Sequence, residues 1–253
     1  MIVLVALRKE LLEQWRTYRF LVVLATLTAF GFASPLLAKM MPQLFELIPG
    51  AEGFSQLIPS PTTRDAVDQY IRNTNQFGVL LGLLLAMGMV AQEKERGTLA
   101  LVLVKPMPRW AVLAAKFAAL GITFAASLTA ASLAAYFYTF VLFEALPLGG
   151  WLALSGLLLL FVLVYAAFTL FASTLTRSQA VAGGMGFGLI LLLAALAAIP
   201  TVGEYMPLQL MGWGAALALG QTPDPAWGAL AVSVGIIVVS LVAAWAVFRR
   251  QEL

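Results

Sequence analysis

The stretch from Ala145 to Thr176 reads ALPLGGWLALSGLLLLFVLVYAAFTLFASTLT and contains no charged residue. A helix needs about 20 mostly apolar residues to cross the roughly 30 Å hydrocarbon layer of a membrane, so this stretch is long enough to span one. Further apolar runs of similar length lie on both sides of it. They are 18–38, broken only by Arg19, and 73–92, 117–143, 178–203, 205–223 and 225–248.

Composition assigns the whole chain of 253 residues to one class of protein. Apolar residues make up 62% and charged residues 11%, against roughly 45–50% and about 25% in soluble domains. We therefore expect an all-α integral membrane protein with a single transmembrane domain over residues 1–253. The chain has no His and no Cys, which excludes disulfides, imidazole or thiolate metal sites, and His- or Cys-dependent catalysis.

Charge distribution decides between six and seven spans. With six spans and a cytoplasmic N-terminus, only Lys39, Arg64 and Arg72 of the 15 Lys and Arg residues fall outside. Lys and Arg near span ends stay on the cytoplasmic side, whereas a seventh span would put Arg249 and Arg250 outside. The sequence thus predicts six transmembrane helices in a prokaryotic plasma membrane, with both termini cytoplasmic.

The run 205–223 is the one that we do not count as a transmembrane span. It is interrupted by Pro207, Gly212, Gly214, Gly220 and Pro223. We interpret residues 203–224 as an outer re-entrant or interfacial element between spans 5 and 6, because irregular backbone at membrane depth is tolerated only where protein or a wet cavity covers it. A plain surface loop is the alternative.

Two further segments lie outside the spans. Within residues 1–18, Leu4, Leu7, Leu11, Trp15 and Tyr18 recur at helical spacing, with Arg8, Lys9, Glu13 and Arg16 away from them. That pattern predicts an amphipathic helix in the headgroup plane. Residues 39–72 form a predicted outer loop whose prolines prevent one continuous helix. Ser60 and Pro61 form a helix-start signal near its end.

The spans lack the groups that other transport mechanisms use. No acidic or basic residue lies in the middle of a predicted span, although proton- and sodium-driven transporters usually place such residues there. No Gly-Lys dipeptide occurs, so the chain has no Gly-rich phosphate loop ending in Gly-Lys-Ser/Thr. We find no catalytic residues, and any uphill transport must draw its energy from another subunit.

Residues 92–109, between spans 2 and 3, read QEKERGTLALVLVKPMPR. Gly97 would end the helix leaving span 2, residues 99–104 could form a short apolar helix, and Pro106 would end it. Such a helix, held between charged turns, would form a rigid projection to which a cytoplasmic partner could bind. On charge alone, the same residues could serve only to fix the orientation of the chain in the membrane, as charged inner loops do in other membrane proteins.

The runs EKERGTL and LVKPMPR, the following Lys116 and the early ALRKEL resemble the permease subunits of type-2 ABC transporters, an ABC exporter family. The resemblance implies that two such subunits, identical or different, pair around a path, and that each docks on a cytoplasmic ABC ATP-binding subunit carrying ATP and magnesium. The coupling loop, 93–110, would act through Glu93, Glu95, Arg96, Gly97, Thr98, Leu99, Lys105, Pro106 and Arg109. The N-terminal segment would be the elbow helix, with Arg8, Lys9, Glu10 and Trp15.

Polar and small residues in the spans are candidates for the translocation path. Asn75 and Gln76 lie in span 2, and Gly184 and Gly188 in span 5 have the spacing that lets helices approach closely. Plain helix packing is the alternative role for the glycines. A dry, uncharged path favours a hydrophobic or amphipathic substrate such as a lipid, drug or peptide.

Three functions fit this sequence to different degrees. An ATP-driven exporter subunit, with membrane lipids and protein subunits but no nucleic acid as partners, best explains the stiff loop. A non-transporting scaffold would share the basic inner face but needs no such loop. A passive channel would need a polar pore lining, of which the sequence shows little.

Overall fold

The computed structural model describes residues 2–46, 60–97 and 108–251. Every regular element within these residues is helical. The first half contains α1 (Ile2–Arg16), α2 (Arg19–Glu46), α3 (Thr63–Asn73), the π-helical η2 (Thr74–Gly78), α4 (Val79–Met87) and α5 (Ala91–Glu95). The second half contains α7 (Arg109–Leu142), α8 (Leu148–Leu175), α9 (Gln179–Ala197), α10 (Pro200–Gly203), α11 (Gln209–Ala218) and α12 (Trp227–Phe248).

The prediction of six spans is confirmed. In the described part of the chain, six helical stretches are long and apolar enough to cross a membrane: Arg19–Leu44, Thr63–Glu95, Arg109–Leu142, Leu148–Leu175, Gln179–Ala197 and Trp227–Phe248. The run 205–223 is divided between a turn and α11, which at ten residues is too short to span.

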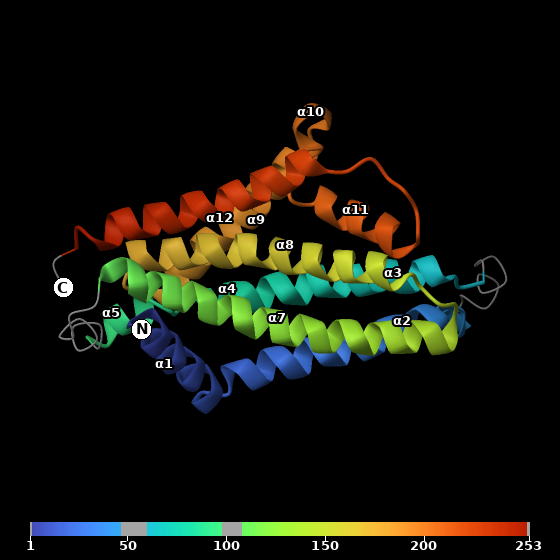
Figure 1. Ribbon diagram of the computed structural model, residues 1–253, viewed down its shortest axis with the longest axis horizontal. Coiled ribbons are helices and arrows are strands. Elements are labelled where there is room, and N and C mark those ends of the chain that lie inside the picture. Colours follow the sequence, from blue (N-terminus) through green and yellow to red (C-terminus); the bar gives the residue numbers. More distant parts are fainter. Residues whose placement is uncertain (1, 47–59, 98–107, 252–253) are drawn as a thin grey trace.

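The long helices lie side by side as an elongated bundle (Figure 1). The start of α1, the end of α12 and α5 lie at one end of it, together with most of the cationic residues that the structure describes; we call this the basic end. Helix α1 crosses the bundle there at a steep angle, and α11 lies along α8 in the opposite half.

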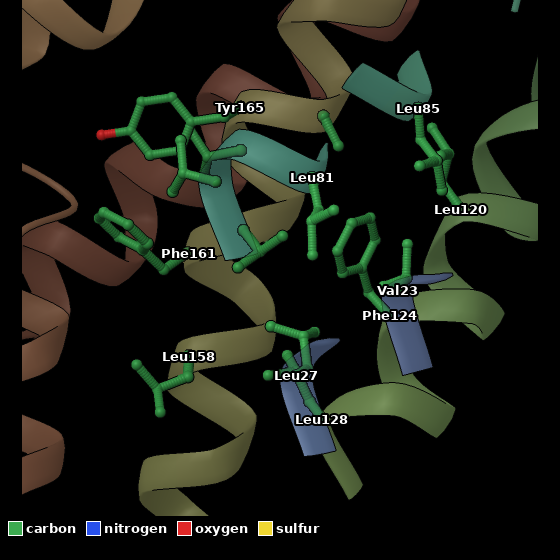
Figure 2. Close-up of a cluster of buried hydrophobic side chains, with 14 of the residues drawn as sticks. Val23, Leu27, Leu81, Leu85, Leu120, Phe124, Leu128, Leu158, Phe161 and Tyr165 are labelled. Atoms are coloured by element: carbon green, nitrogen blue, oxygen red, sulfur yellow. The ribbon is translucent and has the colours of Figure 1, made fainter. Parts of the chain in front are cut away.

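The core forms where α2, α4, α7 and α8 meet. Figure 2 shows Val23 and Leu27 of α2 facing Phe124 of α7, with Leu81 of α4 next to them and Phe161 of α8 farther to the left, near Tyr165. Burial is uneven around this core. In the most apolar window of each span, 67% of Thr63–Glu95 is buried, against 22% of α9 and 17% of α12. The outer two helices therefore keep wide apolar faces that no described part of this chain covers.

Two boundaries differ from the predictions for the loop 39–72. Helix α2 runs through Pro42 to Glu46, so that proline does not end the helix. Helix α3 begins at Thr63, and its N-cap is Thr62, not Ser60. The Asp65 carboxylate accepts hydrogen bonds from the Thr62 amide and hydroxyl, each at 2.7 Å. This capping arrangement fixes the start of the helix.

Span 2 is broken at two places. The first is η2, where Gly78 comes so close to α8 that an added Cβ would lie 3.0 Å from Val162 Cγ2. The second break lies between α4 and α5, at residues 88–90. A break in a helix leaves backbone groups that must find other partners. The partners at the second break belong to the site described next.

Candidate functional site

Five charged side chains from three separate elements meet at the basic end. We call Lys9, Glu10, Glu13, Glu93 and Lys116 the lysine–glutamate cluster. Helix α1 supplies the first three, α5 supplies Glu93, and α7 supplies Lys116. Lys116 is only 1% exposed and Glu10 only 6%. Charges at such burial are stable only when they are paired.

The two lysines bridge the three carboxylates. Lys116 Nζ lies 3.1 Å from Glu10 Oε1 and 2.9 Å from Glu93 Oε1. Lys9 Nζ contacts the same two oxygens at 3.0 and 3.1 Å, and Glu13 Oε2 at 3.1 Å. Each of these oxygens on Glu10 and Glu93 thus contacts two ammonium groups. A shift of α1 or α5 against α7 would break several ion pairs at once.

The close approach of these charged groups shifts the pKa values of Lys9 and Glu13. Burial alone would lower the pKa of Lys9, but attraction to Glu10 and Glu93 overcomes it and raises the pKa above its ordinary value. Burial would likewise raise the pKa of Glu13, but its hydrogen bond with Lys9 and the nearby cations lower it. One oxygen each from Glu10, Glu13 and Glu93 lie within 4.8 Å of one another, and the two lysines supply the positive charge between them.

Polar contacts extend the cluster along α1 and α2. The Thr123 hydroxyl of α7 donates to Gln14 Oε1 of α1 at 2.5 Å, with both side chains buried. Arg19 Nη2, at the start of α2, donates to Gln92 Oε1 of α5 at 2.9 Å. Helix α1 therefore docks on the bundle through a polar face, and Trp15 and Tyr18 stay exposed.

The end of α8 holds the second break of span 2. The Ser173 hydroxyl accepts from the amides of Val90 and Ala91, at 3.0 and 2.9 Å, and donates to the Met87 carbonyl at 2.8 Å. It thereby satisfies backbone groups that the break leaves without helical partners. The next residue, Thr174, accepts on its carbonyl from Lys94 Nζ at 2.5 Å and from Gln251 Nε2 at 2.9 Å.

Arg109 connects the start of α7 to the end of α12. Its Nη1 donates to the carbonyls of Phe248 and Gln251, at 2.6 and 2.7 Å. Its guanidinium carbon also lies 5.8 Å from the centre of the Phe248 ring, within reach of a cation–π contact. Because the last carbonyls of a helix lack partners of their own, Arg109 acts as a C-cap for α12.

The structure brings some of the predicted coupling and elbow residues together and leaves others apart. Glu93, Lys9 and Glu10 share the cluster, and Arg109 binds the end of α12. Arg8, Trp15, Glu95 and Arg96 are exposed, and Gly97 has a φ of 69°, which suits glycine. Thr98, Leu99, Lys105 and Pro106, with the predicted helix over 99–104, lie outside the described residues.

None of the four predicted path residues is fully buried within this chain. Asn75 is half-buried and Gln76 exposed, both within η2. Gly184 and Gly188 face open space on α9. The glycines of α9 that pack within this chain are instead Gly183, against Met87, and Gly186, against Thr169.

Sequence reasoning missed the buried partners of the site. Lys116 entered only as part of a motif, because a lysine before an apolar run resembles any charge that flanks a span. Gln14, Thr123 and Ser173 were not singled out. A helical-wheel reading of α1 places Glu10 and Gln14 one turn apart, and this spacing was the available signal for a polar docking face.

Comparisons with known proteins agree with this architecture. Residues 4–253 match the family described as ABC-2 family transporter protein. The chain is also 26% identical to the uncharacterized transmembrane protein YxlG of Bacillus subtilis (strain 168) over 258 residues, covering 99% of this chain and 98% of that protein. Since the family match covers nearly the whole chain, this protein belongs to the ABC-2 family of membrane transporter proteins.

Proposed function

We propose that the chain is the membrane-spanning permease subunit of an ATP-driven exporter. A separate cytoplasmic ABC subunit binds ATP and magnesium and hydrolyses the ATP, and a second permease subunit, identical or different, completes the path. The substrate is hydrophobic or amphipathic. The basic end is the cytoplasmic side of a prokaryotic plasma membrane, since Lys and Arg collect there.

The observation that carries this proposal is the lysine–glutamate cluster. It fastens α1 and α5, which lie at the surface of the basic end, to buried Lys116 of α7. Force applied to α1 or to the segment after α5 therefore reaches a core helix through ion pairs. Glu95 and Arg96 are exposed, which supports their proposed contact with a partner. Ser173 and Arg109 extend the same connection to α8 and α12.

The direct test is purification from the native source in a mild detergent. We expect a protein with ATPase activity to co-purify in near one-to-one stoichiometry. Reconstituted with that partner, the Glu93→Gln variant should move several-fold less substrate per ATP hydrolysed, because the neutral amide weakens the contacts with both lysines.

Glu144→Gln is the matched control, since Glu144 is exposed at the other end of the bundle. It should leave the ratio of transport to hydrolysis unchanged. A chain that purifies alone, without ATPase activity, would favour a scaffold over an exporter.

A further inference from the structure

Helix α1 has two faces of different chemistry. The face against the bundle is formed by Ala6, Glu10 and Gln14, which recur every four residues and are all buried. On the opposite side an exposed row repeats at the same spacing, and we call it, with its two exposed neighbours, the outer face of α1: Leu4, Arg8, Leu12 and Arg16, with Val5 and Trp15. Side chains four residues apart lie on one side of a helix, so docking of the first face fixes the direction of the outer face.

The outer face carries only positive charge. The two carboxylates of α1 belong to the lysine–glutamate cluster, where Glu10 is buried and Glu13 pairs with Lys9 at 3.1 Å. Arg8 and Arg16 stay exposed, among apolar side chains that are exposed as well. In the predicted pattern the arginines lay away from the apolar stripe. The structure instead places both kinds of side chain on one face, because the docking face takes up the acidic and amide groups.

The start of the first span places this face at the membrane surface. Helix α1 ends at Arg16 and α2 begins at Arg19, so only two residues separate them. One of them, Tyr18, has a φ of 59°, a left-handed conformation uncommon outside glycine. Figure 1 shows that α1 then crosses the bundle at a steep angle instead of extending α2. The outer face, opposite the docked one, points sideways from the bundle, where lipid headgroups surround the start of a span.

This combination of groups is complementary to anionic lipids. Apolar side chains of an interfacial helix enter the boundary between headgroups and acyl chains, and arginine binds phosphate through paired, charge-assisted hydrogen bonds. Arg8 and Arg16 are eight residues apart, or about 12 Å at 1.5 Å per residue, which is too far for one phosphate.

We propose that the outer face of α1 binds anionic phospholipids, and that Arg8 and Arg16 each hold the phosphate of a separate lipid. An ATP-binding subunit would reach the basic end along the axis of the bundle, whereas this face points sideways. Chain geometry and charge therefore favour lipid over protein as the occupant.

The test places a fluorophore on the outer face of the whole protein in lipid nanodiscs. The chain has no native cysteine, so the dye NBD attached to Leu12→Cys reports that position alone. All discs contain equal amounts of phosphatidylglycerol and phosphatidylcholine, and the acyl chains of one or the other lipid carry a quenching nitroxide. We expect nitroxide on phosphatidylglycerol to quench the dye at least about twofold more strongly than nitroxide on phosphatidylcholine, because each arginine attracts the anionic lipid.

Paired variants separate the arginines from membrane contact itself. Arg8→Gln with Arg16→Gln should make quenching by the two lipids equal without abolishing it, since the apolar side chains still contact lipid. Arg249→Gln with Arg250→Gln, at exposed positions after α12, is the matched control and should keep the wild-type preference.

Three results would overturn the proposal. They are equal quenching by both lipids in the wild type, a preference that survives Arg8→Gln with Arg16→Gln, and no quenching by either lipid. The last result would mean that water or another protein covers the outer face. These readouts depend neither on ATP nor on transport, so they can fail or succeed independently of the proposed exporter function.

Discussion

At the scale of single residues, Lys116 is the position on which the basic end depends most. Its side chain is almost fully buried in α7, and the carboxylates of Glu10 and Glu93 contact its ammonium group. Removing one member of a buried ion pair leaves the others charged in a medium of low dielectric constant. The usual cost is about 3–5 kcal/mol.

We therefore expect Lys116→Met to lower the free energy of unfolding by roughly 3 kcal/mol, measured by thermal or denaturant unfolding in detergent. Adding Glu10→Gln and Glu93→Gln to the same chain should recover part of the loss, because fewer unpaired charges remain. Arg8→Met, at an exposed position, should change stability by no more than about 0.5 kcal/mol. A Lys116→Met variant as stable as the wild type would show that the cluster does not hold α1 in place.

Arg109 is the second residue that joins elements far apart in the sequence. Arg109→Gln should loosen the end of α12, since hydrogen bonds to charged groups contribute about 1.5–3 kcal/mol each. Hydrogen exchange measured by mass spectrometry should then rise about tenfold or more over residues 245–251. Arg96→Gln is the control, because Arg96 is exposed. Equal protection in the two variants would contradict the capping role of Arg109.

At the scale of elements, α11 depends on close contact with the first turn of α8. A Cβ added at Gly150 would overlap the backbone carbonyl of Leu217, whereas one added at the neighbouring Gly149 meets nothing within 4 Å. The two glycines thus form a matched pair in the same helical turn.

Gly150→Ala should displace α11 and lower the midpoint of thermal unfolding by several degrees, and a cysteine placed at Ala216 should react faster with maleimide. Gly149→Ala should leave both quantities near those of the wild type or raise the midpoint slightly, because alanine favours the helix. If both variants have the same unfolding midpoint and the same maleimide reactivity, then the close packing of α11 on α8 is not what holds α11 in place.

The sequence was most informative about the number and position of the membrane-spanning helices. Uncharged runs of about 20 residues located all six spans, because the bilayer requires that length of any chain that crosses it. The break at residues 88–90 was not predictable, since its backbone groups find their partner in Ser173 of another helix. For the same reason, the polar docking face of α1 could not be found from its apolar pattern. A pattern shows which face is apolar, but not which polar groups find partners.

At the scale of the whole molecule, the proposed orientation in the membrane rests on the position of the basic end. The chain has no native cysteine, so single introduced cysteines report their own surroundings. In intact cells, a membrane-impermeant maleimide should label Asp224→Cys and should not label Glu95→Cys until the membrane is opened. Labelling of Glu95→Cys in intact cells would reverse the proposed orientation.

The central claim is that the basic end is the surface on which an ATP-binding subunit docks. The most direct measurement is photo-crosslinking in native membranes from a benzophenone attached to Arg96→Cys, with the same probe at Glu144→Cys as the control. Both positions are exposed, at opposite ends of the bundle. We predict that the probe at position 96 captures an ATP-binding protein and that the probe at position 144 does not. Absence of such a protein at position 96, or its equal capture at position 144, would contradict the account.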